Sequence, residues 1–68
     1  MSQTSREFML IIAGQIGKSP QEIEKFIAIL EENFIDTADA LRDITDEQWR
    51  NDLKFPVGLV NKIKKQLT

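Results

Sequence analysis

The sequence predicts an all-α protein in which residues 1–68 form one compact five-helix bundle. Apolar residues recur every three or four positions, and no segment shows the sustained apolar–polar alternation of a half-buried strand. Ser, Thr or Asp precedes most of these apolar runs, where helix caps belong. With 68 residues, of which 41% are hydrophobic and 29% charged, the chain has the composition of a small folded domain and not of a disordered tail.

Two capping boxes mark where the first two helices begin. In such a box, a hydroxyl and a carboxylate three residues apart each bond an otherwise free backbone amide. The pairs that fit this pattern are Thr4 with Glu7 and Ser19 with Glu22. The first predicts a helix over residues 5–15 that ends around Gly14 and Gly17. The second predicts a helix with Pro20 at its first position and Asn33 at its end.

The apolar pattern is clearest in the second helix, where side chains at i, i+3, i+4, i+7 and i+11 fall along one face. That stripe consists of Ile23, Phe26, Ile27, Leu30 and Phe34. The helices together supply a small core, in which each buried side chain contributes roughly 1.5–3 kcal/mol before entropy is subtracted. The predicted core residues are Phe8, Ile12, Phe26, Leu30, Leu41, Trp49, Leu53, Phe55, Ile63 and Leu67.

The middle of the chain predicts two shorter helices. The third is expected over residues 37–42, with Asp36 as its cap and Asp39 in its first turn, where negative charge suits the helix dipole. The fourth is expected to begin after Thr45, because Thr45 and Gln48 again have the spacing of a capping box.

The last helix is expected to run from about Pro56 to Leu67. Its start lacks the usual capping residue, because Phe55 stands where Ser, Thr or Asp is common. Its first amides must therefore bond to water, to backbone or to a partner. Lys64 and Lys65 fall in its last turns, where positive charge complements the helix dipole.

Three blocks in the chain follow one another in an order that one family shares. An aromatic-led helix ends in an acidic turn at residues 26–36, which read FIAILEENFID. Residues 40–49 then read ALRDITDEQW, and residues 53–63 read LKFPVGLVNKI. With these blocks and this helix order, the chain resembles the sterile alpha motif domains from Phe26 to Leu67. The resemblance implies a sterile alpha motif-like bundle that binds proteins and catalyses no reaction.

Three features depart from the family pattern. Lys54 stands where the family usually has glycine, and Leu59 with Val60 replaces a polar pair that often opens the last helix. The first helix also contains no tryptophan. The first two departures fall on a surface that such domains use for partners, so they bear on which partner is bound more than on the fold.

Charge is divided along the chain. Residues 1–30 contain three basic and three acidic side chains, and residues 31–53 contain eight acidic and two basic ones. Residues 54–68 contain four lysines and no acid, and the whole chain has a net charge of −2. Complementary surfaces on one molecule permit head-to-tail contacts between copies, and their charges mainly set encounter rate and register.

The resemblance implies that a mid-domain surface of one copy meets the start of the last helix of a neighbour. We define the predicted acidic surface as Asp36, Asp39, Asp43, Asp46 and Glu47. We define the predicted last-helix surface as Lys54, Val57, Gly58, Leu59 and Lys62. There Gly58 allows a partner's backbone to approach closely. Positions 56, 59, 60 and 63 share a helix face, which allows Leu59 to lie in the core, whereas the family pattern implies that Leu59 is at least partly exposed.

A simpler interpretation accounts for several of the same charges. Acidic residues near helix starts serve as caps or complement the helix dipole. The residues to which this applies are Asp36, Asp39, Asp46 and Glu47. Lys64 and Lys65 likewise complement a helix end, whereas Lys62 lies nearer the middle of its helix. The two interpretations of the acidic residues are compatible, and the sequence leaves both open.

Composition narrows the possible chemistry. The chain has no cysteine and no histidine, which excludes zinc fingers, thiol redox chemistry, imidazole metal sites and Cys–His or Ser–His nucleophilic pairs. Carboxylates are abundant, but a bundle this small leaves little room for a catalytic cleft, and the spacing of a calcium loop is missing. We therefore expect no enzyme activity, no cofactor and no metal.

The expected partner is a protein, either another copy of the chain or another helical interaction domain. The alternative is a domain that binds RNA hairpins or other nucleic acid; the net charge of −2 and the absence of arginine from the last helix disfavour it. A helical fold of the death-domain type is a further alternative with a similar function. The longest apolar run has six residues, too few for a membrane span, so we expect a soluble cytoplasmic protein.

Overall fold

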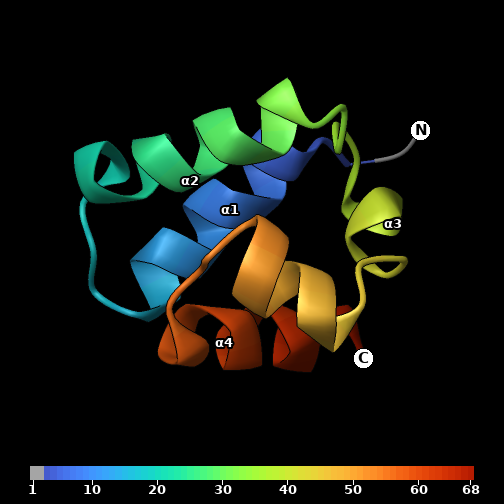
Figure 1. Ribbon diagram of the computed structural model, residues 1–68. Helices are drawn as coiled ribbons and strands as arrows, with labels where there is room; N and C mark the ends of the chain where they lie inside the picture. The colour runs from blue at the N-terminus through green and yellow to red at the C-terminus, as the bar shows by residue number, and fades with distance from the viewer. Residues whose placement is uncertain (1–2) are drawn as a thin grey trace.

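Five helices make up most of residues 3–68, the part of the chain that the computed structural model describes (Figure 1). Four are α-helices, and one, η1, is a short π-helix. Their bounds are α1 Ser5–Gln15, α2 Pro20–Glu32, α3 Ala38–Leu41, η1 Gln48–Asp52 and α4 Val57–Leu67. The prediction of an all-α chain with five helices is confirmed.

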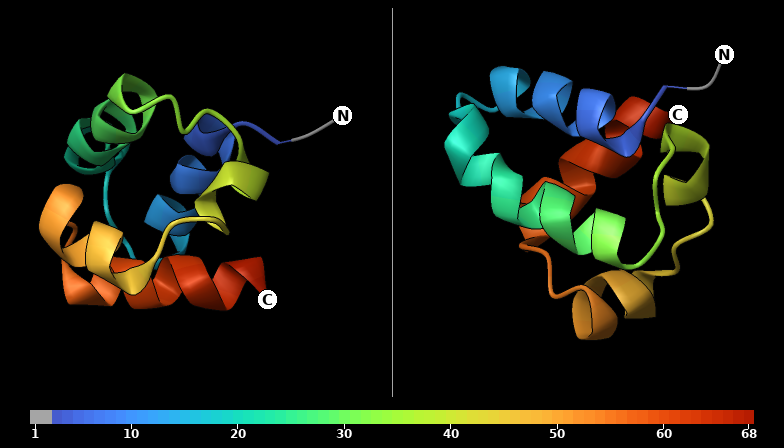
Figure 2. Two further views of the ribbon diagram at one scale, coloured as in Figure 1. Left: turned by 45° about the vertical axis from the view of Figure 1, so that its right-hand side comes forward. Right: turned by 90° about the horizontal axis from the view of Figure 1, so that it is seen from above.

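α1 lies at the centre of the bundle and packs against α2, α3 and α4. In Figure 1, α2 lies above α1 and α4 lies below it. The stretch that contains α3 and η1 runs from the end of α2 to the start of α4, as the two views of Figure 2 also show. The Cα radius of gyration is 10.8 Å, close to the value of about 11 Å expected for a compact chain of this length.

Side-chain caps begin α1 and α2 as predicted. Thr4 Oγ1 accepts a hydrogen bond from the Glu7 amide at 3.0 Å, and the Glu7 carboxylate accepts one from the Thr4 amide at 3.0 Å. Ser19 and Glu22 form the same box at the start of α2. Because the ionised carboxylates accept these backbone hydrogen bonds, the pKa of Glu7 and that of Glu22 lie below their ordinary values.

The starts of the two short helices differ in part from the prediction. Thr37 caps α3 in place of Asp36, because the Thr37 hydroxyl accepts the amide three residues further on at 3.2 Å. Thr45 and Gln48 form the predicted box. The chain then widens into the π-helix η1, after which the Leu53 amide donates to the Gln48 carbonyl five residues back at 2.8 Å.

Three helices end by turning through a residue with positive φ. These residues are Gly17 at +70°, Phe34 at +59° and Lys54 at +56°. In each turn the following amide donates back into the helix: Lys18 to Ala13 at 2.9 Å, Ile35 to Leu30 at 2.9 Å, and Phe55 to Trp49 at 3.1 Å. This left-handed helix end is the one that glycine favours, so phenylalanine and lysine occupy two positions where glycine is better suited.

The position of Phe34 corrects the predicted stripe of α2. Because α2 ends at Glu32 and Asn33 caps it, the left-handed turn directs the Phe34 side chain away from the stripe and leaves it 87% exposed. The other four stripe residues lie in the core or against it: Ile23, Phe26, Ile27 and Leu30. The prediction that Asn33 ends the helix is confirmed, and the prediction that Phe34 continues the stripe is wrong.

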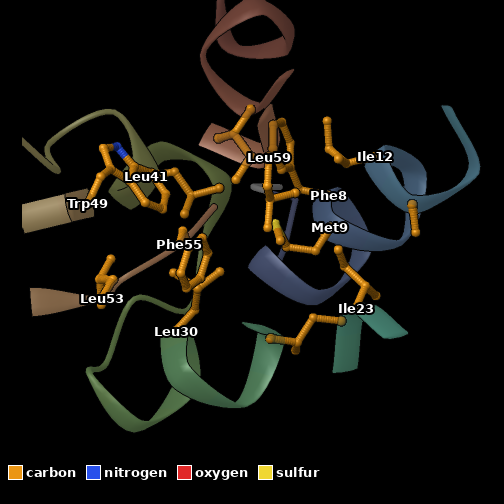
Figure 3. Packing of buried hydrophobic residues seen from close by; sticks show 13 residues of the cluster. Phe8, Met9, Ile12, Ile23, Leu30, Leu41, Trp49, Leu53, Phe55 and Leu59 are labelled. Carbon is orange, nitrogen blue, oxygen red and sulfur yellow. The ribbon is translucent and has the colours of Figure 1, made fainter. Parts of the chain in front are cut away.

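The core draws on apolar side chains from every helix (Figure 3). Its buried residues are Phe8, Met9, Ile12, Ala13, Ile23, Ile27, Leu30, Leu41, Trp49, Leu53, Phe55, Leu59 and Ile63. Of the predicted core, only Phe26 and Leu67 are partly exposed, and both still pack against the cluster. Phe55 joins two aromatic neighbours, because its ring centroid lies 5.0 Å from that of Phe26 and 5.2 Å from that of Trp49.

The residues that precede and begin α1 are fixed to the link between α2 and α3. The Ser5 amide donates to the Asp36 carbonyl at 2.8 Å, and the Ala38 amide donates to the Gln3 carbonyl at 2.9 Å. Ser5 is buried, and its hydroxyl donates to the Ile35 carbonyl at 2.5 Å. The link that contains the first residue of the acidic surface is therefore held against α1.

The left-handed conformation of Lys54 predicts that glycine stabilises the fold at this position. Lys54→Gly removes a steric cost of about 1–2 kcal/mol and adds about 0.5–1 kcal/mol of unfolded-chain entropy. We expect the free energy of unfolding in urea to rise by about 0.5–1 kcal/mol. Lys54→Ala is the matched control, because it removes the charge and keeps the Cβ atom. An equal rise in both variants contradicts the backbone explanation.

Candidate interaction surfaces

All five residues of the predicted acidic surface are exposed, and they lie between the end of α2 and the start of η1. Two of them already have partners within the molecule. Asp39 pairs with Arg42 at 2.5 Å, and Asp46 pairs with Lys64 of α4. The other three form no ion pair within residues 3–68: Asp36, Asp43 and Glu47. These three are the acidic groups of this surface that are available to a partner.

The acidic side chains do not line one common hollow. Asp39 borders a hollow between α3 and the end of α4, and Asp43 borders another beside η1. Asp46 borders a third hollow, which Val57 of the last-helix surface also lines. Asp52 shares the hollow of Asp43, and sequence reasoning had not selected it. The acidic surface is therefore a band along the α3–η1 side of the bundle.

Most residues of the predicted last-helix surface, at the start of α4, are exposed to solvent. Pro56 is its N-cap, and no side chain among the described residues caps it. Lys54 and Gly58 are exposed, Val57 is 75% exposed, and Lys62 is half-buried. The last-helix surface is therefore a small apolar and basic area around the first turn of α4.

Leu59 is the exception, because it is only 6% exposed and belongs to the core. Leu59 and Ile63 are four residues apart on α4, so they share the face that packs inward. Figure 3 shows the Leu59 side chain within the buried cluster. The expectation from the family pattern that Leu59 is partly exposed is wrong. Leu59 instead follows the helical period, which places it on the same face as the buried Ile63.

The ion pair between Asp46 and Lys64 joins the acidic surface to the basic helix of the same molecule. The hydrogen bond from the Lys64 ammonium to the Asp46 carboxylate lowers the pKa of that carboxyl below its ordinary value. The separation of acidic from basic side chains remains when the residues in ion pairs are left out. The acids of residues 31–53 that form no ion pair within the described chain are Glu32, Asp36, Asp43, Glu47 and Asp52, and the corresponding lysines of residues 54–68 are Lys54, Lys62 and Lys65.

An apolar groove lies beside the start of α4, and sequence reasoning missed it. It encloses about 590 Å³ between the α1–α2 turn, the first half of α2 and the start of α4. Its apolar lining consists of Ile16, Ile23, Phe26, Pro56, Gly58 and Leu59. Its polar lining consists of Lys18, Gln21, Glu22 and Lys25. The available signal was Phe26, a stripe residue in the middle of α2 that is only partly buried against the core.

The described part of the chain offers little for other kinds of site. Within residues 3–68, no group of three His, Cys, Asp or Glu side chains is placed to hold a metal ion. No helix in this part of the chain combines the length and apolar character needed to cross a membrane. The candidate sites are therefore the two charged surfaces and the groove.

Comparison with known proteins leaves these surfaces as the basis for any functional assignment. No family model, no curated protein and no solved structure matches the chain. The resemblance to sterile alpha motif domains accordingly depends on the ordered residues of the sequence alone.

The pKa of Asp46 tests whether the acidic surface is partly neutralised within the molecule. We expect Lys64→Met to raise this pKa towards the ordinary value of 3.8, because the ammonium that stabilises the ionised carboxylate is removed. Since the folded-state pKa is depressed, the pair stabilises the fold at pH values above 3.8 and loses this effect as the carboxyl protonates below it. Side-chain NMR titration measures the pKa directly. Asp43, which forms no ion pair within residues 3–68, is the internal control.

Proposed function

We propose that this chain is a non-catalytic protein–protein interaction module of the sterile alpha motif kind. It self-associates head to tail, or it pairs with another domain of the same kind. The observation that supports this most is the division of charge that remains after internal ion pairs are set aside. Among residues 31–68, the acids that form no ion pair within the described chain lie on the band from the end of α2 to η1, and the lysines that form none lie on α4 and just before it.

Two observations support the family resemblance. The helix order and the short connections agree with the expected bundle. Lys54 has φ of +56°, a conformation that favours glycine, and glycine is the residue that the family usually has at this position. With lysine in place of the family's glycine, the chain keeps the left-handed turn and gains a positive charge beside the last helix.

The contact that we propose brings the acidic surface of one copy to the last-helix surface of the next. Asp43 and Glu47 supply negative charge, and Lys54 and Lys62 supply positive charge. Val57 adds apolar area, since its side chain is 75% exposed at the first position of α4. The two surfaces differ, so the contact is heterologous and repeats from copy to copy unless a ring closes.

Charge reversal tests this contact. We expect Asp43→Lys and Lys62→Glu each to weaken self-association several-fold at low salt, because each places like charges opposite one another. Mixing the two variants should yield heterodimers, since each retains one native surface. A chain with both substitutions should associate again, because the reversed charges are complementary. This double variant controls for damage to the fold.

Sedimentation over a range of concentrations and salt provides the measurement. A wild-type chain that stays monomeric at high concentration and low salt contradicts self-association. A double variant that stays monomeric, while circular dichroism shows it folded, contradicts the pairing of these two surfaces.

A further inference from the structure

Phe34 is the feature that a contact between charged surfaces leaves unexplained. Its side chain is 87% exposed, more than any other large apolar side chain in residues 3–68. It follows the Asn33 cap of α2, and its amide donates to the Glu31 carbonyl at 3.1 Å. With the bond from Ile35 to Leu30, this completes the helix end in which the Phe34 position takes a left-handed backbone.

Phenylalanine at this position costs the monomer a strained backbone and gives it no burial in return. A bulky side chain rarely adopts a φ of +59°, which glycine and asparagine tolerate. The exposed ring also gains nothing from burial in the core, because it faces solvent. An unfavourable backbone conformation combined with an exposed aromatic side chain is a reason to look for a contact outside the monomer.

The groove beside α4 offers a site of matching chemistry. Phe26 lines it and is half-buried, and the Lys25 ammonium lies over the Phe26 ring, 5.1 Å from its centroid, so the lining joins an aromatic side chain to a positive charge. Lys18 and Lys25 also line it and form no ion pair within residues 3–68. The one acid of the lining, Glu22, is already bonded to Ser19 in the capping box. The groove therefore combines an apolar lining with available positive charge.

The surroundings of Phe34 carry the opposite charge. Glu32 and Asp36 lie two residues on either side of it, and both are exposed. Neither forms an ion pair within the described residues. An aromatic side chain between two available carboxylates complements an apolar groove that has two available lysines.

Phe34 cannot occupy the groove of its own molecule. The groove is lined by Ile23 and Phe26 in the first half of α2, whereas Phe34 lies beyond the end of that helix. Phe34 lies eight positions beyond Phe26, the nearest lining residue of α2, which corresponds to about 12 Å along a helix axis. The two ends of α2 are well separated in Figure 1 and in the right-hand view of Figure 2. For Phe34 to occupy this groove, it must therefore come from a second copy.

We propose that Phe34 of one copy inserts into the groove of the next copy and is the apolar anchor of their contact. This inference rests on the proposed head-to-tail self-association and names the residue that contributes most to it. The carboxylates of Glu32 and Asp36 then lie towards Lys18 and Lys25 of the neighbour. Buried aromatic side chains are common among the few residues that dominate binding energy at an interface.

The first test removes the anchor without harming the turn. Phe34→Asn places a residue that tolerates positive φ at the same position. We expect the concentration at which half of the chain is associated to rise on the order of tenfold or more, as for loss of a dominant interface residue. The thermal midpoint of the monomer should not fall. Ile11→Gln, which removes an apolar side chain that is 47% exposed on α1 and belongs to neither proposed surface, is the matched control.

The second test fills the groove. A Cβ atom added at Gly58 meets no atom within 4 Å beyond its own helix backbone and chain neighbours, so a side chain can begin there without a clash, and Gly58 lines the groove that Gly58→Leu is designed to fill. We expect this variant to lose self-association, as Phe34→Asn does. A mixture of the two variants should form a 1:1 complex by sedimentation, because one keeps the groove and the other keeps Phe34.

The outcomes separate this inference from the proposed function. If Phe34→Asn associates as strongly as wild type while the charge-reversed variants do not, the anchor is wrong and the head-to-tail contact stands. If the mixture of Phe34→Asn and Gly58→Leu forms no 1:1 complex, Phe34 and the groove do not meet, and the inference is overturned. A wild-type chain that is monomeric under all conditions overturns both.

Discussion

The fold depends on three sharp helix ends, at Gly17, Phe34 and Lys54, where the backbone turns through positive φ. A chain of 68 residues has few residues to spare for loops, and it must still direct every apolar face to one centre. A left-handed residue changes the chain direction in one step and returns the next amide to the helix. Ile35 and Phe55, which follow two of these residues, thereby reach the core or pack against it.

Helix starts could be predicted from the sequence because their signals are local. Thr4 with Glu7 and Ser19 with Glu22 each contain both partners of their hydrogen bonds within four residues. The end of α2 was harder, because the same residues supported a stop at Asn33 and a stripe that continued beyond it. That conflict pointed to Phe34, and only the backbone geometry resolves it. The π-helix has no comparable signal. Thr45 and Gln48 predict where a helix starts, but they do not predict that its hydrogen bonds join residues five positions apart.

The candidate surfaces could be predicted only in outline, because their details depend on contacts between distant residues. Asp46 and Lys64 are 18 positions apart, so their pairing is invisible to a count of charges along the chain. The groove combines residues from the α1–α2 turn, from α2 and from the start of α4, so it could not be predicted from neighbouring residues either. Leu59 could have been placed correctly from the helical period, which set it on the face of Ile63; the family pattern gave the opposite answer.

The two non-glycine residues with positive φ connect the stability of the fold to its proposed contact. At Lys54 and Phe34 the fold requires only a backbone conformation, and glycine supplies it at lower cost. Both side chains are exposed, so neither contributes to the core. Lysine adds charge to the last-helix surface, and phenylalanine adds an apolar group at the far end of α2. In a small domain whose net stability is about 0.05–0.15 kcal/mol per residue, costs of about 1 kcal/mol at each position are substantial. In the proposed contact, self-association offsets these backbone costs only in the assembled state. The monomer carries the costs without compensation, so the balance shifts towards the assembly.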